Sequence, residues 1–332
     1  MSRFSGAFGA AYGAVAMIVV GSSAAVLALI TQYPTFGGQA LRYAGAAVAL
    51  LAVQYVRRLP HLPLSRSELL RLTALAAIGL AGFNVCYLQA VRHADPANVG
   101  AIIGGVPIVL AVLDPLLRSR PPSVRIVAGA VGVSVGVAIT QGFSGGSLLG
   151  LLWALGALAA EVAFSLLAVP LLPRLGALRV STYASGLAVP LLLAAGFAAD
   201  GSGLLRMPTR TELLALAYLA IVVTALAFVL WYASVHRLGA DRAGLCAGLA
   251  PASAVMAAAV LGTGRPTTAN VLGALLVSAS VVVGLAPAPD APDATAPGAP
   301  AAGPPLGGGA TAAPPSDEIP DAAMTAGPQP RS

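Results

Sequence analysis

Two ionisable residues, Glu161 and Arg42, lie inside long apolar runs, where a charge is costly and usually serves a function. Glu161 is the only charged residue between positions 147 and 172. If this run is a helix, a rise of ~1.5 Å per residue puts Glu161 about 20 Å from one end and about 16 Å from the other. A carboxyl at that depth favours its neutral acid form, which suits proton coupling or the sensing of a cation. The alternative is structural: a neutral Glu161 that hydrogen-bonds a neighbouring helix.

Arg42 lies about two helical turns inside a second apolar run, residues 36–56. A guanidinium at this position could bind the carboxylate of a solute, or it could pair with Glu161 across a cavity between helices. In the alternative interpretation Arg42 snorkels towards water or bonds backbone carbonyls. The sequence permits all three arrangements.

Aromatic and amide side chains in two other runs are candidates for the lining of a solute cavity. Asn84 and Tyr87 lie in the run 72–91, and Trp231 and Tyr232 lie in the run 213–235. The three rings could equally belong to the aromatic belts at the membrane interfaces. Asn84 is the stronger cavity candidate, because an amide inside a span needs partners; its alternative is a structural bond between helices.

Composition indicates which elements position these residues. The chain is 58% hydrophobic and 9% charged, with a mean hydropathy of +0.86, whereas soluble domains have about a quarter of their residues charged. Lipid must therefore cover much of the surface, and spans of ~20 apolar residues are expected. Ten such runs predict an all-α integral membrane protein: 7–29, 36–56, 72–91, 97–117, 126–142, 147–172, 180–199, 213–235, 243–263 and 268–286.

The spacing Gly-x-x-x-Gly-x-x-Pro occurs twice, 144 positions apart, at Gly100, Gly104 and Pro107 and at Gly244, Gly248 and Pro251. Upstream, Tyr87 pairs with Tyr232 if one residue of slip is allowed. The chain is therefore predicted to be two copies of one unit, residues 1–143 and 147–286. Each copy has five spans, an odd number, so the second copy must be inverted. Inverted repeats are typical of transporters that open alternately to the two sides of a membrane.

The repeated glycines and prolines have two interpretations. Small residues four apart let two helices approach closely in lipid, which makes them packing faces. Each proline should also kink its helix about one turn after the glycines. A packing face beside a kink could serve as a hinge between the two halves.

Arginine placement predicts the orientation, because basic residues beside a span tend to remain cytoplasmic. With the N-terminus inside, the inner segments hold Arg3, Arg57, Arg58, Arg66, Arg71, Arg118, Arg120, Arg125, Arg174, Arg179, Arg237 and Arg242. The outer segments hold fewer: Arg92, Arg206, Arg210 and Arg265. Both termini are thus expected in the cytoplasm of a cell whose cytoplasmic membrane holds the protein. Residues 287–332, rich in Pro, Ala and Gly, are predicted to be a disordered tail.

Several of these features resemble the EamA family of the drug/metabolite transporter superfamily across nearly all of residues 1–286. They are Val20-Gly21-Ser22-Ser23, Pro34, Arg42, and the Tyr87 region followed by the Gly-rich, Pro-containing helix in both halves. The resemblance implies a carrier of small organic solutes, often an exporter of amino acids, metabolites or drugs, with a cavity between the repeats. Members often carry Glu before the proline, where this chain has Val106 and Ala250, so coupling residues are not transferred from the family.

The function classes separate on simple features. A secondary transporter driven by a gradient is favoured, since the chain has no Lys and so no ATP-binding Walker motif. A channel or lipid scramblase is the alternative, but it needs a continuous polar stripe. An enzyme needs paired carboxylates, a His cluster or an activated nucleophile, and none is visible. We expect a small-molecule solute and membrane lipid as partners and no cofactor, metal or nucleic acid; whether a homodimer forms is left open.

Overall fold

The computed structural model describes residues 3–142, 147–260, 262 and 266–286. The predicted tail at 287–332 and the predicted outer Arg265 lie outside the described residues. Within the described residues, ten helices are long and apolar enough to cross a membrane. The predicted fold class, an all-α membrane protein with ten spans, is confirmed.

Several spans are single helices: α1 (Arg3–Leu27), α2 (Thr35–Val56), α7 (Val124–Gln141), α8 (Leu148–Ala168) and α14 (Thr268–Leu285). The seventh span, α9 (Leu172–Asp200), is kinked at Gly176, where φ is 72°. The others are divided. The third span consists of α3 (Arg66–Ala74), the π-helical η2 (Leu75–Gly82) and α4 (Phe83–His93), and the fourth of α5 (Pro96–Ile103) and α6 (Val106–Leu117). The eighth consists of α10 (Arg210–Tyr218), the π-helical η4 (Leu219–Leu226) and α11 (Ala227–Leu238), and the ninth of α12 (Ala240–Leu245), η5 (Cys246–Gly248) and α13 (Leu249–Val260).

The helix boundaries repeat at the offset of 144 that the glycines and prolines suggest. Helices α3 and α10 correspond at both ends, as do the π-helical segments η2 and η4 and the helices α7 and α14. The offset is 144 residues both before and after the π-helical segments. The predicted one-residue slip is therefore wrong, and Tyr87 corresponds to Trp231 and not to Tyr232.

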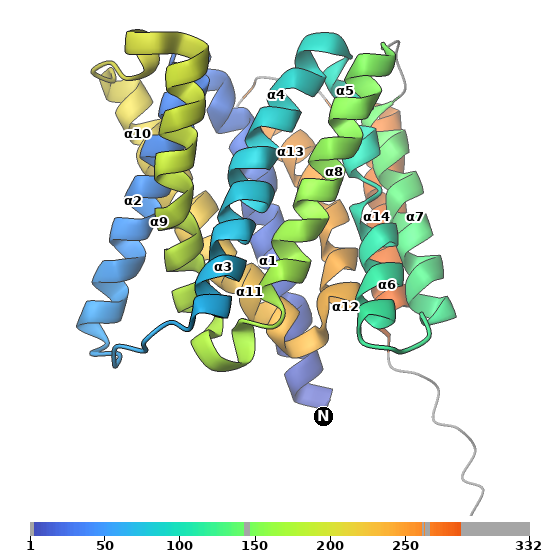
Figure 1. The fold of residues 1–332 in the computed structure, drawn as a ribbon. Coiled ribbons are helices and arrows are strands. Elements are labelled where there is room, and N and C mark those ends of the chain that lie inside the picture. Colours follow the sequence, from blue (N-terminus) through green and yellow to red (C-terminus); the bar gives the residue numbers. More distant parts are fainter. Residues whose placement is uncertain (1–2, 143–146, 261, 263–265, 287–332) are drawn as a thin grey trace, which may run out of the picture. The chain divides into compact units, whose positions relative to one another are not determined.

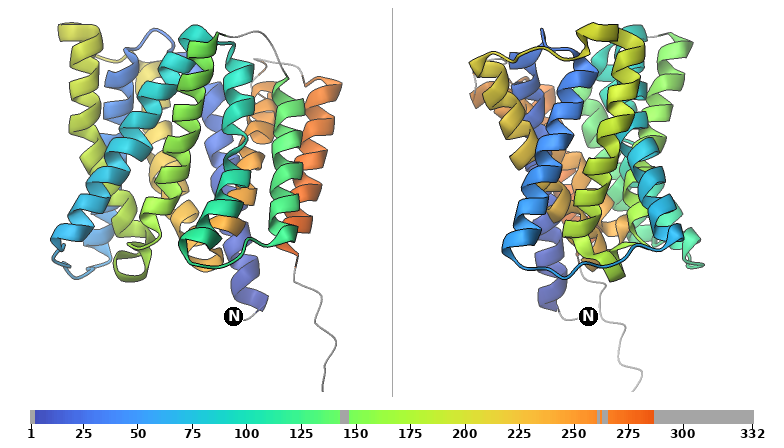
Figure 2. Two further views of the ribbon diagram at one scale, coloured as in Figure 1. Left: turned by 45° about the vertical axis from the view of Figure 1, so that its right-hand side comes forward. Right: turned by 60° about the vertical axis from the view of Figure 1, so that its left-hand side comes forward.

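The two halves are inverted relative to each other. In Figure 1 the helix α3 begins at the lower end of the bundle, whereas its counterpart α10 begins at the upper end. Contacts between the halves are reciprocal: α1 packs on the eighth and ninth spans, and its counterpart α8 packs on the third and fourth. Two corresponding pairs, α2 with α9 and α7 with α14, pack on each other (Figure 2). These contacts are those of a pseudo-twofold axis in the membrane plane.

The repeated prolines divide their spans at a different place from the predicted one. The fourth span is interrupted at Gly104 and Gly105, and Pro107 is the second residue of the next helix. In the ninth span the 3₁₀ turn that ends at Gly248 precedes Pro251. Proline lacks the N–H that would bond the carbonyl four residues earlier, so the helix loosens on the N-terminal side of the proline. The interruption therefore lies at the glycines and not one turn after them.

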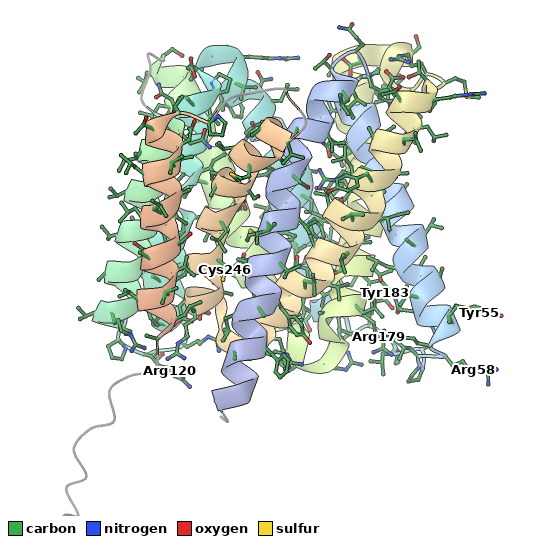
Figure 3. The ribbon with its side chains drawn as sticks, turned by 180° about the vertical axis from the view of Figure 1, so that it is seen from behind. Tyr55, Arg58, Arg120, Arg179, Tyr183 and Cys246 are labelled. Carbon is green, nitrogen blue, oxygen red and sulfur yellow. The ribbon has the colours of Figure 1, made fainter. Side chains whose placement is uncertain are left out.

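Arginines gather at one end of the bundle. Figure 3 shows Arg58, Arg120 and Arg179 at its lower end, the end at which α1 begins in Figure 1. Arg206 and Arg210 lie in and after the connection between α9 and α10, at the opposite end. The arginines that the sequence assigned to the two sides of the membrane thus lie at opposite ends of the bundle.

Candidate functional site

Glu161 lies in the middle of α8 and is only partly accessible to solvent. It forms no hydrogen bond or ion pair with the described part of the chain. Its carboxyl interacts electrostatically with the hydroxyl of Tyr43 on α2. Glu161 is therefore a carboxyl inside the bundle whose hydrogen-bonding capacity is left for a solute, water or a proton.

Arg42 lies on α2, and neutral groups hold its guanidinium. Nε donates to the Thr224 Oγ1 at 2.5 Å, and Nη1 donates to the Gln39 Oε1 at 3.4 Å. The guanidinium carbon lies 5.6 Å from the centre of the Tyr43 ring. No ion pair joins Arg42 to Glu161 among the described residues, so the structure does not form the pair that the sequence permitted.

Tyr43 links the two ionisable residues. It is 4% exposed, it lies beside Arg42, and it interacts electrostatically with both Arg42 and Glu161. Its hydroxyl also lies near the side chain of Asn84, whose Nδ2 donates to the Leu80 carbonyl of its own span at 2.8 Å. Arg42, Tyr43, Asn84 and Glu161 therefore form one polar group, called here the central cluster, built by three spans from both halves.

Trp231 and Tyr232 are buried beside the central cluster, 4% and 0% exposed. Trp231 Nε1 donates to the Ser165 hydroxyl at 3.2 Å, and the Tyr232 hydroxyl approaches the Phe164 carbonyl at 3.5 Å. The Tyr232 ring also packs on the Phe164 ring, with centroids 5.0 Å apart. Both residues thus hold α11 against α8, and neither lies at an interfacial belt.

Tyr87 has a different environment. It is 41% exposed and stacks on Phe83 of the preceding turn, with ring centroids 5.8 Å apart. The structure therefore separates Tyr87 from Trp231 and Tyr232, although the sequence grouped the three rings together.

The repeated glycines lie where helices approach closely. A Cβ on Gly100 would lie 3.0 Å from the Gln141 side chain, and a Cβ on Gly104 would overlap Val137, both on α7. In the second half, a Cβ on Gly244 would lie 2.9 Å from Leu110, and a Cβ on Gly248 would overlap Val133. These glycines lie at packing contacts with α6 and α7, and Gly104 and Gly248 also lie at the interruptions of their spans. Both properties are compatible with a hinge.

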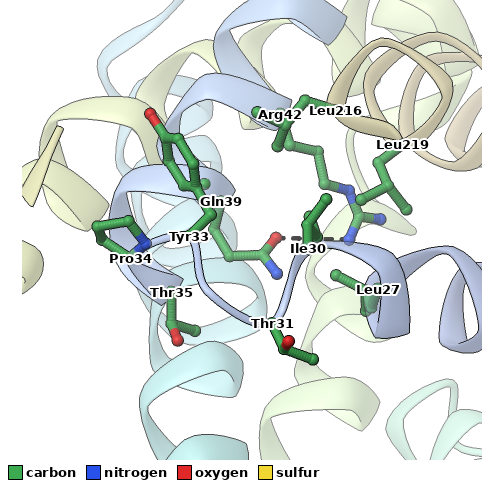
Figure 4. A pocket seen from close by; sticks show the side chains of 11 residues that line it. Leu27, Ile30, Thr31, Tyr33, Pro34, Thr35, Gln39, Arg42, Leu216 and Leu219 are labelled. Carbon is green, nitrogen blue, oxygen red and sulfur yellow. Dashed lines mark hydrogen bonds between the residues drawn. The ribbon is translucent and has the colours of Figure 1, made fainter. Parts of the chain in front are cut away.

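A pocket opens beside Arg42, between α2, the end of α1 and the start of the eighth span. It has a volume of about 140 Å³, and Figure 4 shows the Arg42 guanidinium and the Gln39 amide pointing into it. We call it the α2 pocket; it is lined by Leu27, Ile30, Thr31, Tyr33, Pro34, Thr35, Gly38, Gln39, Arg42, Leu216 and Leu219.

At the lower end of the bundle, Glu68 joins the two halves. Ser65 and Glu68 form a capping box at the start of α3, which fixes the carboxylate in place. The carboxylate forms an ion pair with Arg174, at the start of α9, and Arg174 Nη2 also donates to the Pro63 carbonyl at 2.8 Å. We call this contact the Glu68 latch.

At the upper end, Glu212 occupies the position of Glu68 plus 144. Thr209 and Glu212 form the matching capping box, and Glu212 forms an ion pair with Arg206. The guanidinium of Arg206 donates hydrogen bonds to the Glu212 carboxylate, and these bonds raise the pKa of Arg206. Arg206 lies 4.9 Å over the Tyr33 ring, and its carbonyl accepts a hydrogen bond from the Tyr33 hydroxyl at 2.8 Å. Tyr33 belongs to the first half, so this contact, the Glu212 latch, also joins the halves.

Four functional elements escaped the interpretation of the sequence: Tyr43, Thr224 and the two latches. Tyr43 adjoins Arg42, and Thr224 is a hydroxyl in an apolar run, but neither shows its partner in the sequence. A usable signal existed for the latches, because Ser-x-x-Glu at 65–68 and Thr-x-x-Glu at 209–212 differ by the repeat offset. Among the described residues, no group of three or more His, Cys, Asp and Glu side chains could hold a metal ion.

The fold and the central cluster define a class: a ten-span membrane protein of two inverted repeats, with ionisable residues inside the bundle. Comparison with known proteins specifies that class. The model of the EamA-like transporter family matches residues 7–141 and again residues 148–285. The chain belongs to the EamA-like transporter family, within the drug/metabolite transporter superfamily.

Two individual proteins are similar to this chain. The uncharacterized transporter YetK of Bacillus subtilis (strain 168) is 27% identical over 256 residues, which cover 75% of this chain and 78% of YetK. A crystal structure of another protein resembles this chain with a TM-score of 0.69 and 20% sequence identity. The matched region covers 83% of this chain and 96% of the other chain, and this likeness concerns the fold. Family membership makes this chain a multi-pass membrane protein of the transporter class, with small solutes as its substrates.

Proposed function

We propose that this protein is a secondary transporter that exports small organic solutes by alternating access between its inverted halves. The observation that carries the proposal is the symmetry of the body. Corresponding helices begin at opposite ends of the bundle, and the contacts between the halves are reciprocal. In such a body an outward-open and an inward-open arrangement have similar energies, because each is close to the inverted image of the other.

The central cluster is where the solute or the coupling ion binds in this proposal. Glu161 has no hydrogen-bonding partner in the described chain, and a buried carboxyl exchanges a proton when a gradient drives it. Glu161 then couples transport to protons or binds a cationic group. Asn84 and Tyr43 supply hydrogen bonds to the solute, and the glycine-rich interruptions of the fourth and ninth spans allow the halves to rock.

The two latches close the two ends in turn. Opening the lower end separates Glu68 from Arg174, and opening the upper end separates Arg206 from Tyr33. Each latch is exposed to solvent on its arginine side, where ion pairs are weak and easily broken. Weak, matched contacts at both ends suit a body that must leave either closed state readily.

The lower end is cytoplasmic in this proposal, with both termini on that side of the cell membrane. The support is the excess of arginines at that end. Cysteines introduced one at a time at Ser119 and Thr31, with Cys86 and Cys246 replaced by alanine, test it in intact cells. A membrane-impermeant maleimide should label Thr31→Cys and spare Ser119→Cys. Labelling of Ser119→Cys alone would reverse the orientation.

Transport itself is tested with the full chain in proteoliposomes. Uptake of labelled amino acids, other metabolites and organic cations is measured with and without a pH gradient. Counterflow, in which unlabelled solute inside accelerates the entry of labelled solute, distinguishes a carrier from a channel. Vesicles sorted by orientation then give the preferred direction.

The variant Glu161→Gln tests the coupling role, and Asp200→Asn, which removes an exposed acid at the end of α9, is the matched control. We expect the gradient to stimulate the parent and Asp200→Asn but not Glu161→Gln. Equal stimulation of all three would show that Glu161 does not couple protons. Passage of solutes without counterflow would reject the carrier mechanism.

A further inference from the structure

Arg42 carries a charge inside a span without a carboxylate partner in the described chain. Its hydrogen bonds go to the Thr224 hydroxyl and the Gln39 amide, both neutral. A charged side chain at such a position is unfavourable unless something compensates it. An anionic group from outside the protein would provide that compensation.

The α2 pocket has room and donors for such a group. A guanidinium has five N–H donors. The bond to Thr224 uses the one on Nε, and the bond to Gln39 uses one of the two on Nη1. The remaining donors lie at the pocket with the hydroxyls of Thr31 and Thr35. A planar carboxylate matches the guanidinium fork, which binds it through two parallel hydrogen bonds.

Beside the Arg42 guanidinium the lining of the pocket is apolar and includes Leu27, Leu216 and Leu219 (Figure 4). We propose that the α2 pocket binds the carboxylate of an acidic solute at Arg42, with an apolar part of the solute against these leucines. The inference rests on the proposed transport function, for which it names a substrate class.

The fold is symmetric, but the site occurs at only one of its two ends. At the offset of 144, Arg42 corresponds to Gly186 and Thr224 corresponds to Leu80. Neither Gly186 nor Leu80 has a side-chain donor, so the inverted pocket at the lower end does not reproduce the site. An acidic solute should therefore favour the state in which the upper pocket is accessible, which breaks the energetic equality of the two open states.

Thr224 connects the pocket to the backbone of the eighth span. Its hydroxyl donates to the Leu219 carbonyl five residues earlier at 2.8 Å, inside the π-helical segment η4, and it accepts from Arg42. A carboxylate that draws the guanidinium towards the pocket would strain this chain of hydrogen bonds. Binding can thus be transmitted to a segment type often found at functional sites.

Binding is tested on the purified full chain with benzoate as the acidic probe and benzamide as its uncharged isostere. Thermal unfolding is followed over a concentration series of each. We expect benzoate to raise the unfolding temperature and benzamide to leave it unchanged. Stabilisation by both to the same extent would overturn the proposal, because charge would then be irrelevant.

Three variants locate the site. Arg42→Gln keeps hydrogen-bonding capacity without charge and should weaken benzoate binding about tenfold or more, the size of a lost charge-assisted bond. Arg42→Lys should bind with intermediate strength, and it also serves if Arg42→Gln fails to fold. Arg92→Gln, which removes an exposed arginine at the same end, should bind like the parent. Unchanged binding in both Arg42 variants would exclude the site.

Two further comparisons distinguish the acidic-solute site from a lipid-binding site and from the proposed transport function. Added phosphatidylglycerol tests whether a lipid phosphate is the real anion; stabilisation by this lipid and not by benzoate would refute the solute site. The binding assay needs no transport. Transport without benzoate binding would therefore remove only the acidic-solute proposal, and binding without counterflow would remove only the transporter mechanism.

Discussion

Replacing Gly136 with alanine should force α7 and α14 apart. A Cβ at this position would lie 2.9 Å from the carbonyl oxygen of Gly273 and from the backbone nitrogen of Val277. Ordinary contacts of a Cβ begin near 3.4 Å, so the helices must separate by about half an ångström. Backbone atoms cannot rotate away as a side chain can, and overpacking of this kind costs about 1–3 kcal/mol.

Gly186→Ala is the matched control, because the nearest foreign atom to its Cβ is the methyl of Ala47 at 4.0 Å. Both variants gain the helix preference of alanine, about 1 kcal/mol, so the difference between them isolates the packing cost. Thermal unfolding should place Gly136→Ala below Gly186→Ala by roughly 2–12 °C, at 2–4 °C per kcal/mol. Equal unfolding temperatures would refute the view that these backbone contacts set the spacing of α7 and α14.

The other predictions concern the site. Glu212→Gln removes the ion pair that holds Arg206 and so weakens the Glu212 latch; it should speed alkylation of a cysteine placed in the α2 pocket. Glu68→Gln should slow the same alkylation, because each latch holds a different end closed; changes in the same direction would contradict that assignment. Trp231→Phe loses the hydrogen bond to Ser165 and should lower the free energy of unfolding by about 1–2 kcal/mol, measured by thermal unfolding; no loss would mean that water replaces the bond. Glu161→Gln should retain counterflow while losing stimulation by a pH gradient in proteoliposomes, since counterflow needs no net proton movement; a loss of both would indicate that Glu161 binds the solute itself.

Much of the fold follows from the sequence because apolar length is a strong signal. The ten predicted spans all occur, although the third span begins at Arg66 and not at 72. The error has a physical reason: Arg66, Glu68 and Arg71 are charged, but they lie in the first turns of a helix that the Ser65 capping box starts, outside the apolar run.

The site was less predictable, because it depends on which faces of distant helices meet. The sequence marks Glu161 and Arg42 as unusual, but helix packing decides that both interact with Tyr43 and do not pair with each other. The π-helical segments carry no local signature in their apolar sequence, and they decide the direction of every side chain that follows them in the third and eighth spans.

Each π-helical segment can be regarded as an insertion into an ordinary helix. One extra residue turns everything downstream by about 100°, so η4 aims the row of Phe228, Trp231 and Tyr232 at α8. The insertions at η2 and η4 share the same register, which is most simply explained if the ancestral five-helix unit already carried the insertion before its gene was duplicated. Deleting one residue from η4 should restore regular winding and swing that aromatic row away from α8. With Trp153 replaced by Phe, loss of the Trp231 fluorescence shift on unfolding would report this change.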